Sequence, residues 1–327
     1  MTVRIGTRAS KLALTQTQQT ADQLAAVGGF PVELVHITTE GDVKTGSLSQ
    51  MGGTGVFVAA LRDALLQETC DVAVHSLKDL PTGAALGLTI AATPKRVDVR
   101  DVLCSRDGLK LADLPQGAKV GTGSPRRAAQ LRAARPDLDV RDIRGNVDTR
   151  LGRVPGLPGN AESAPGDLDA VVLAAAGLER IGRLDTVSEF FETDVMLPAP
   201  GQGSLAIECR TADAPRRAGS TEGSQAVLAQ ALAALNDEDT RLAVTAERAV
   251  LARLEAGCAA PVGAFAYRKG SMLHLEAAVC AVDGTRTVRE KKATDGLTEV
   301  GATLLGIEVA ELLLAAGAAE IADLAAS

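Results

Sequence analysis

The chain has 327 residues and a formal net charge of −7, and 46% of its residues are hydrophobic but only 2% aromatic. At about 150 residues per domain, this length predicts two or three domains, with a core of aliphatic side chains. The absence of tryptophan and the single tyrosine argue against a protein that stacks single-stranded nucleic acid on aromatic rings. The negative charge gives no general attraction to nucleic acid or to an anionic membrane, so any bound anion requires a local basic cluster.

The cellular compartment is predicted from the N-terminal residues, the longest apolar run and the spacing of the cysteines. The N-terminal residues form no apolar stretch of the signal-peptide kind. The longest apolar run, 304–319, is interrupted by Glu308 and Glu311, so no membrane span is expected. The cysteines at 70, 104, 209, 258 and 280 form no CxxC pair, which suits a reducing compartment and argues against a zinc site. We therefore expect a cytoplasmic protein without a metal.

Strand-like and helix-like segments alternate from the N-terminus. The expected elements are a strand at 3–6, a helix from Ser10 to Gly28-Gly29, a strand at 32–37, a helix at 56–68 and a strand at 71–75. Ser10 is a suitable N-cap, and the glycine pair can end the helix. This βαβα rhythm predicts a mainly parallel sheet.

A second unit begins near Lys95. Strands are expected at 119–121, 138–143 and 168–173, and Ser124 can cap a helix whose first residue is Pro125. The segment 155–167 is rich in Pro, Gly and Ala, which predicts a loop.

A third unit follows the Gly-rich link 213–224. The expected elements are a helix at 239–255 ended by Gly257, strands at 263–267, 272–282 and 285–291, and a final helix at 297–316. Asp283-Gly284 predicts a hairpin turn between the last two strands.

Arginines stand where the predicted strands end. Arg126 and Arg127 occupy the first turn of a helix, where the macrodipole disfavours cations unless an anion binds there. The alternative is a pair of solvated arginines, and this segment alone does not decide between the two.

Other strand ends repeat the pattern. Arg144 to Arg150 follows a strand, at the edge where α/β sheets place ligands, with Gly145 allowing a tight turn. By itself this segment is better described as an ordinary polar loop. Arg8 with Ser10 follows the first strand, and Arg180 follows the strand that ends at Leu173. Because four strand ends offer arginine, an anion site is favoured over coincidence.

Two further residues are candidates for chemistry. Asp79, next to Lys78, follows a strand; it is either half of a surface pair or a carboxylate for acid–base work or charge stabilisation. His75 completes an apolar strand and is expected to be structural. Cys258 lies between Gly257 and Pro261, which predicts a loop, although a lone cysteine is usually a small buried hydrophobe. Nucleotide, zinc and serine-hydrolase motifs are absent from the sequence.

Taken together, these segments resemble the porphobilinogen deaminase (hydroxymethylbilane synthase) family. The segments that carry the resemblance run in the family's order and cover nearly the whole chain: 4–13, 75–81, 121–127, 144–150, 173–180, 200–203 and Gly257-Cys258.

The resemblance implies an α/β fold of three domains. Two lobes would resemble a two-domain periplasmic binding protein, with residues 1–94 plus 197–221 as domain 1 and 95–196 as domain 2. Residues 222–327 would form a smaller α+β domain that carries the cofactor cysteine. Crossovers near Lys95 and near 196–200 would form the hinge.

The resemblance also implies the chemistry. The enzyme would be a transferase that deaminates and polymerises porphobilinogen into the linear tetrapyrrole hydroxymethylbilane, primed by a dipyrromethane bound covalently to Cys258. It would act as a monomer in the heme pathway, with uroporphyrinogen-III synthase downstream.

The resemblance assigns the site residues as follows. Asp79 would be catalytic and would also contact the cofactor. The other cofactor-binding residues would be Lys78, Thr122, Ser124, Arg126, Arg127 and Arg144, and the substrate-binding residues would be Arg8, Ser10, Arg150, Arg180 and Gln202. Each pyrrole brings two carboxylates, for which arginine is a natural partner.

The sequence departs from the family pattern in three places. Thr54 stands where lysine is common, Gly123 and Pro125 replace serine and leucine, and the 155–167 loop resembles an insertion. Whether the loop 43–55 forms an ordered lid is left open. The alternative function is a non-catalytic two-lobed protein that binds anions or other solutes; the cysteine-bearing third domain and the missing signal peptide weigh against it.

Overall fold

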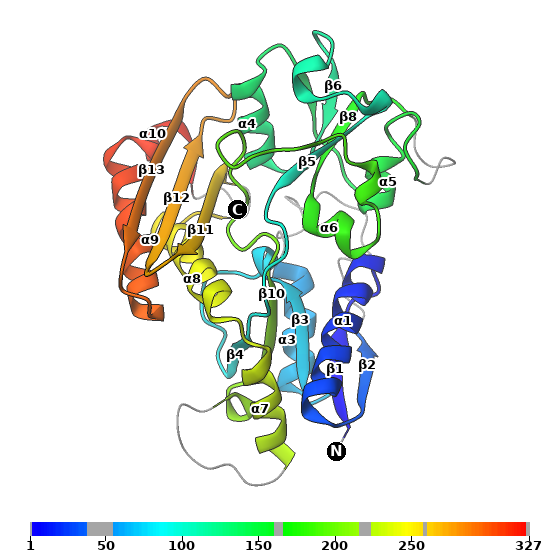
Figure 1. Ribbon diagram of the computed structural model, residues 1–327, viewed down its shortest axis with the longest axis vertical. Coiled ribbons are helices and arrows are strands. Elements are labelled where there is room, and N and C mark those ends of the chain that lie inside the picture. The colour runs from blue at the N-terminus through cyan, green and yellow to red at the C-terminus, as the bar shows by residue number, and fades with distance from the viewer. Residues whose placement is uncertain (1, 38–54, 160–165, 216–223, 258–259, 325–327) are drawn as a thin grey trace. The chain divides into compact units, whose positions relative to one another are not determined.

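The computed structural model describes residues 2–37, 55–159, 166–215, 224–257 and 260–324 (Figure 1). The chain forms two compact units, one of residues 1–96 with 204–242 and one of residues 97–203 with 243–327. The division into three domains stays a proposal; the second unit here contains residues 97–196 of the predicted second domain and the C-terminal sheet as well. Thr54 and nearly all of the 43–55 loop lie outside the described residues, as do Cys258 and positions 160–165 of the 155–167 loop.

The first unit is built on a five-stranded sheet in the order β2-β1-β3-β10-β4. Its elements are β1 (Val3–Thr7), α1 (Lys11–Gly28), β2 (Val32–His36), α3 (Gly55–Leu66), β3 (Val72–Ser76), the 3-10 turn η1 (Leu77–Asp79), β4 (Leu88–Ala92), β10 (Leu205–Arg210), the 3-10 turn η5 (Thr211–Asp213) and α7 (Ser224–Leu235). The caps expected for α1 are confirmed: the Ser10 side chain accepts a hydrogen bond from the Ala13 N–H, and Gly29 adopts the left-handed conformation with φ +65°.

Alternation along the strands separates the two faces of this sheet. Val72 and Val74 belong to the cluster that packs against α1 and α7, whereas Ala73 belongs to the cluster formed with Leu61 and Leu65 of α3. This is the period of two expected of a strand with both faces covered. The residues that follow β1 and β3 therefore emerge from a rigid, buried sheet.

The second unit contains a five-stranded sheet in the order β7-β6-β8-β5-β9. Its elements are β5 (Asp101–Ser105), the 3-10 turns η2 (Arg106–Gly108) and η3 (Leu111–Asp113), β6 (Lys119–Gly121), α4 (Pro125–Ala134), β7 (Asp139–Arg141), α5 (Val147–Leu151), β8 (Ala170–Ala174), α6 (Ala175–Arg180), the 3-10 turn η4 (Leu184–Thr186) and β9 (Glu189–Phe190). Ser124 caps α4 by accepting from the Arg127 N–H, with Pro125 in the first turn. That part of the sequence prediction is confirmed.

The expectation of mainly parallel sheets is wrong in part. In the first unit β1 pairs in parallel with β2 and β3, but β10 is antiparallel to both of its neighbours. In the second unit β6 has the parallel pairs and β5 the antiparallel ones. The βαβ rhythm predicts only connections between strands close in sequence, whereas β10 returns to its sheet from far along the chain.

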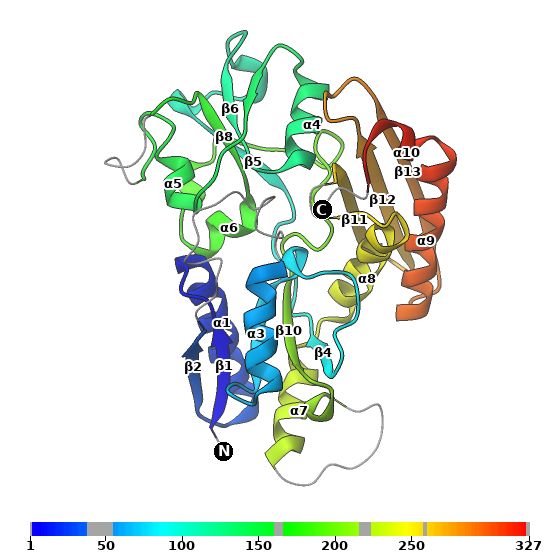
Figure 2. The same cartoon turned by 180° about the vertical axis from the view of Figure 1, so that it is seen from behind.

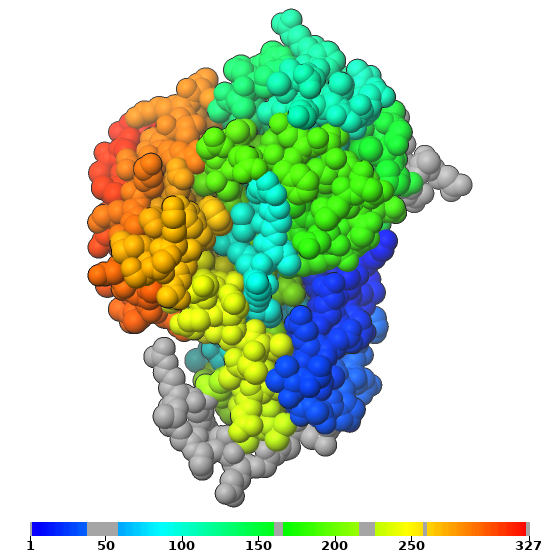
Figure 3. Space-filling view, viewed as in Figure 1, coloured from blue at the N-terminus to red at the C-terminus, as the bar shows by residue number. Residues whose placement is uncertain are grey.

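The C-terminal part of the second unit is a three-stranded antiparallel sheet covered by helices. It consists of α8 (Glu238–Arg253), β11 (Val262–Lys269), β12 (Met272–Cys280), β13 (Thr287–Thr294), α9 (Glu299–Ala315) and α10 (Ala318–Ile321). Helix α9 packs on β12 and β13 (Figure 2). This orange-to-red region lies against the green residues of the same unit (Figure 3). The predicted α/β fold with a smaller C-terminal α+β part is confirmed.

Candidate functional site

In the first unit, two of the predicted groups leave the same end of the sheet. Arg8 and Ser10 follow β1, and Lys78 and Asp79 lie in η1 directly after β3. Because β1 and β3 are parallel neighbours, their carboxyl ends lie side by side. All four side chains are partly buried. The Ser76 hydroxyl donates to Gln16 Oε1 at 3.3 Å, and the Leu77 N–H donates to the Ser204 carbonyl at 3.0 Å, so the turn that carries Asp79 is fixed on both sides.

A buried polar group anchors the strand before that turn. His75 Nε2 lies 3.2 Å from Glu208 Oε2, and Arg62 Nη2 lies 2.9 Å from Glu208 Oε1. Glu208 is fully buried in β10. Burial opposes its ionisation, but the hydrogen bonds and charges of His75 and Arg62 outweigh burial and lower the pKa of Glu208. His75 therefore lies in the core, as expected, whereas Glu208 was missed; its signal was an acidic residue inside an apolar strand.

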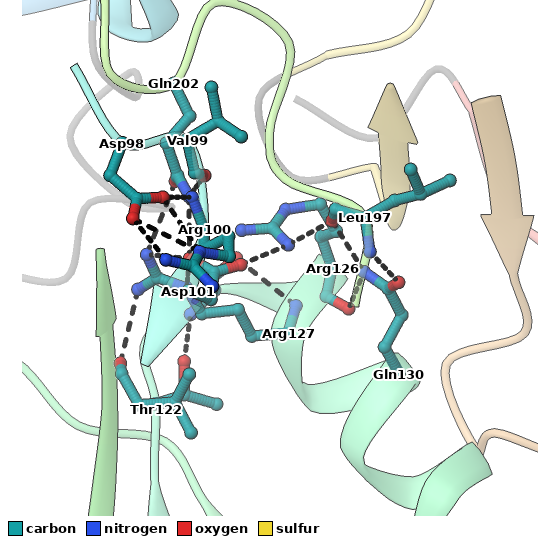
Figure 4. A network of polar contacts seen from close by, with 12 residues as sticks. Asp98, Val99, Arg100, Asp101, Thr122, Arg126, Arg127, Gln130, Leu197 and Gln202 are labelled. Atoms are coloured by element: carbon teal, nitrogen blue, oxygen red, sulfur yellow. Dashed lines mark hydrogen bonds and ion pairs between the residues drawn. The ribbon is translucent and has the colours of Figure 1, made fainter. Parts of the chain in front are cut away.

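In the second unit, Arg126 and Arg127 are not solvated. Their exposed fractions are 3% and 5%, and both contact the carboxylate of Asp101 at the start of β5 (Figure 4). Arg126 Nη1 lies 2.7 Å from Oδ2, and Arg127 Nη2 lies 2.8 Å from Oδ1. The anion beside these arginines is the carboxylate of Asp101, which belongs to the protein itself. Asp101 was not among the predicted site residues, because its only signal in the sequence is a polar residue at the head of an apolar strand.

Three more of the predicted residues join this cluster. Gln202 is buried and donates from Nε2 to Asp101 Oδ1 at 2.8 Å. Thr122 is buried, and its hydroxyl accepts from the Ser124 N–H at 3.3 Å. Ser124 in turn accepts from the Arg127 N–H at 3.4 Å. The hydroxyls of Thr122 and Ser124 therefore fix the loop between β6 and α4 through hydrogen bonds to its backbone.

Arg150 adds a further cation next to the same loop. Burial, together with the positive charges of Arg127 and Arg144, lowers the pKa of Arg150 to about 10. Its Nη2 would lie 3.7 Å from a Cβ atom at Gly123, and its Nε donates to the Gly145 carbonyl at 2.8 Å. Arg144 is exposed and lies 3.7 Å from Asp142. Positive charge thus exceeds negative charge around this loop.

Arg180 ends α6 and points to the segment that contains Gln202. Its Nη2 donates to the Gly203 carbonyl at 2.9 Å, and burial lowers the pKa of Arg180 to about 10. Among the described residues, no carboxylate forms an ion pair with Arg180, and a desolvated guanidinium in that situation favours a bound anion.

The described cysteines are poor nucleophiles. Cys70, Cys104, Cys209 and Cys280 are buried. Burial raises the pKa of Cys70 and Cys104 to about 11 and that of Cys209 to about 12. Since the thiolate is the reactive form, these four are disfavoured as points of covalent attachment. Cys258, which lies outside the described residues, stays the candidate.

Comparison with known families decides the assignment. Residues 3–218 match the family model described as porphobilinogen deaminase, dipyromethane cofactor binding domain, and residues 241–315 match the porphobilinogen deaminase C-terminal domain. The chain belongs to the porphobilinogen deaminase family.

Curated relatives agree over nearly their whole length. The porphobilinogen deaminase of Cutibacterium acnes is 56% identical, with 99% of this chain and 98% of the relative aligned. The enzyme of Leifsonia xyli is 53% identical over 98% and 94%, and that of Mycobacterium bovis is 48% identical over 98% of each chain.

Solved structures give only distant matches. A methionine-binding protein aligns with 71% of this chain and 89% of its own length, at 13% identity and a TM-score of 0.41. A periplasmic substrate-binding protein of a Coxiella burnetii transporter aligns with 71% and 91%, at 15% identity and a TM-score of 0.43. Neither match carries weight in the assignment. Among the described helices, none has the length and apolar character needed to cross a membrane.

The residues around Asp101 fit the dipyrromethane of this family. A dipyrromethane with acid side chains is a polyanion, and the cluster has more guanidinium groups than carboxylates. In addition, the Nε of Arg126 is buried without a hydrogen-bond partner among the described residues. A buried donor without a partner is costly, and a carboxylate of the cofactor would satisfy it.

Proposed function

We propose that this chain deaminates porphobilinogen and joins the resulting units into the linear tetrapyrrole hydroxymethylbilane, primed by a dipyrromethane attached through the sulfur of Cys258. The observation that carries the proposal is the buried arginine cluster at the start of α4, in a chain that belongs to the porphobilinogen deaminase family. A polyanionic pyrrole chain needs such a receptor, and a protein with a net charge of −7 has to build it locally.

The arginines divide by position in this proposal. Arg126 and Arg127, with Lys78, Thr122, Ser124 and Arg144, bind the acid side chains of the cofactor. Arg8, Ser10, Arg150, Arg180 and Gln202 bind the incoming substrate and the growing chain. Fixed guanidinium groups orient the carboxylates and reduce the entropy lost when the reacting atoms meet.

Asp79 supports the chemical step. As the amino group of the substrate leaves as ammonia, positive charge develops on its pyrrole ring. The Asp79 carboxylate offsets this charge and can hold the pyrrole N–H by accepting its hydrogen bond. When bound, the dipyrromethane supplies the free α-carbon to which the first substrate is joined. The protein works as a cytoplasmic monomer, and uroporphyrinogen-III synthase is the enzyme that takes up the product.

The test is the intact mass of the purified protein under denaturing conditions. The expected mass exceeds the sequence mass by one dipyrromethane, and Cys258→Ser removes the increment. The matched control is Cys104→Ser, a buried thiol that keeps the adduct. An active wild-type protein with the unmodified mass would overturn the proposal and favour a solute-binding function.

A further inference from the structure

The carboxylate of Asp101 accepts hydrogen bonds from side chains of two separate segments of the second unit, helix α4 and the segment that contains Gln202 (Figure 4). Oδ2 accepts from Arg126 Nη1 at 2.7 Å, and Oδ1 accepts from Arg127 Nε at 2.9 Å and from Gln202 Nε2 at 2.8 Å. The side chain is completely buried. It does not contact solvent, so its partners are all provided by the protein.

We propose that Asp101 is the positioning residue that assembles the cofactor-binding arginines before any ligand arrives. This inference rests on the proposed function, because it takes Arg126 and Arg127 to be the residues that bind the dipyrromethane. Asp101 acts through the two arginines and itself contacts neither cofactor nor substrate.

The geometry supports a preassembled receptor. Each guanidinium has five N–H donors. The Nη1 of Arg126 donates to Asp101 at 2.7 Å and to the Leu197 carbonyl at 2.6 Å. The Nη1 of Arg127 donates to the Val172 carbonyl at 3.2 Å. Arg127 also donates from Nε to Asp101 and from Nη2 to Gln202 Oε1 at 3.4 Å, so protein groups hold all three of its nitrogens. The buried Nε of Arg126 has no partner among the described residues and stays available for an acid side chain.

One carboxylate offsets enough positive charge for Arg126 and Arg127 to be buried side by side. Burying two neighbouring guanidinium groups without a counter-charge is strongly unfavourable, because each loses its hydration and the two repel each other. Burial also opposes ionisation of Asp101, but the charges of Arg126 and Arg127 outweigh it and hold the pKa of Asp101 well below its usual range. The triad therefore keeps a net charge of +1, which is low enough to bury and still attracts an anion.

The position of the triad distinguishes it from an ordinary core ion pair. It lies at the amino end of α4, where the macrodipole adds positive potential, and Arg150 is close enough for its pKa to be lowered by the charge of Arg127. Leu197, whose carbonyl binds Arg126, is also held by Gln130 through its N–H at 2.8 Å. The arrangement is thus fixed from α4, β5 and the 197–202 segment together.

The experiment compares three variants with wild type by intact mass, thermal melting and steady-state kinetics. Asp101→Asn keeps the size but removes the charge, and Asp101→Glu keeps the charge. The matched control is Asp71→Asn. Asp71 also bridges two arginines, Arg4 at 2.8 Å and Arg210 at 3.3 Å, at the opposite end of β3 from Asp79.

Asp101→Asn is expected to lose the adduct mass from most of the protein, and Asp101→Glu to regain part of it. Asp71→Asn is expected to lower the melting temperature but keep full occupancy. Full occupancy with wild-type KM in a folded Asp101→Asn protein would overturn the inference, as would equal cofactor loss in Asp71→Asn. If Asp101→Asn does not fold, Asp101→Glu decides: occupancy and KM equal to wild type contradict a positioning role. A wild-type protein without the adduct would instead refute the proposed function itself.

Discussion

At the scale of single residues, the chemistry depends on which carboxylates are ionised and how deeply they are buried. Asp101 and Glu208 are buried carboxylates that arginines and, for Glu208, a histidine keep ionised. Asp79 differs from both, because it is only partly buried and lies in a turn at the end of a strand. This placement leaves its carboxylate accessible to a substrate while the turn itself is held by backbone contacts.

Asp79→Asn is expected to lower kcat by about 10²- to 10⁴-fold, which is the range for a positioned acid–base or charge-stabilising group. KM should change far less, because the arginines hold the substrate carboxylates. Steady-state kinetics on protein of known cofactor occupancy measures both. The control is Asp22→Asn, an exposed carboxylate on α1 of the same unit. A loaded Asp79→Asn enzyme that works within a few-fold of wild type would refute the role, since a surface ion pair contributes below about 1 kcal/mol.

Thiol reactivity should single out Cys258. Arg127→Leu is expected to lack the cofactor, and in that variant iodoacetamide at pH 8 is expected to label one cysteine. The label should disappear in the further variant Cys258→Ser. With a pKa of about 11, Cys70 and Cys104 have only about one thiolate in a thousand at pH 8. Because their pKa values are raised, labelling of these thiols can only increase as the pH rises toward 11. Peptide mapping that finds Cys104 labelled first at pH 8 would contradict the assignment.

At the scale of elements, the loop between β6 and α4 is shaped by close backbone contacts. A Cβ atom at Gly123 would lie 2.5 Å from the carbonyl oxygen of Ile143. A serine at this position would therefore require the backbone to shift. Glycine allows the Ile143 carbonyl, in the segment after β7, to pack directly against the loop. The side chain of Arg150 packs beside the same glycine.

Gly123→Ala is expected to lower the free energy of unfolding by about 1–3 kcal/mol, the usual cost of overpacking against backbone. Gly177→Ala is the matched control. Gly177 lies in α6 of the same unit with nothing within 4 Å of its Cβ position, so alanine there should stabilise by about 0.5–1 kcal/mol. Urea unfolding of both variants gives the comparison, and an unchanged stability in Gly123→Ala would show that the Ile143 segment yields easily.

At the scale of the whole molecule, an acidic protein handles an acidic substrate. The net charge of −7 repels porphobilinogen at long range, while local guanidinium clusters attract it at short range. Both effects are screened by salt over about 8–10 Å at moderate ionic strength. For a substrate at the site the arginines are the nearer charges, so attraction outweighs repulsion.

KM for porphobilinogen is therefore expected to rise with ionic strength between about 20 and 200 mM salt, since screening acts mainly on the exposed part of the clusters. Initial rates in sodium chloride at constant pH measure it. Arg144→Gln should flatten the dependence, because Arg144 is the exposed member of its cluster. A KM that falls with added salt would mean that the overall negative charge dominates.

The sequence by itself determined the local structure and the family. The caps of α1 and α4, the expected helices and strands, and the arginines at strand ends follow from neighbouring residues, and the structure reproduces them. The strands β4, β5, β9 and β10 were not predicted. The roles of Asp79, Cys258 and the arginines stay predictions until the variants are measured.

Only the tertiary structure decided the strand pairing and the environment of the arginines. β10 joins its sheet between β3 and β4, and Asp101 meets Gln202 from a position 101 residues away. Local periodicity contains no information on such partners, because pairing over long separations depends on which surfaces bury one another. The sequence thus predicted that Arg126 and Arg127 need an anion nearby. That the carboxylate of Asp101 is such an anion could be seen only in the folded chain.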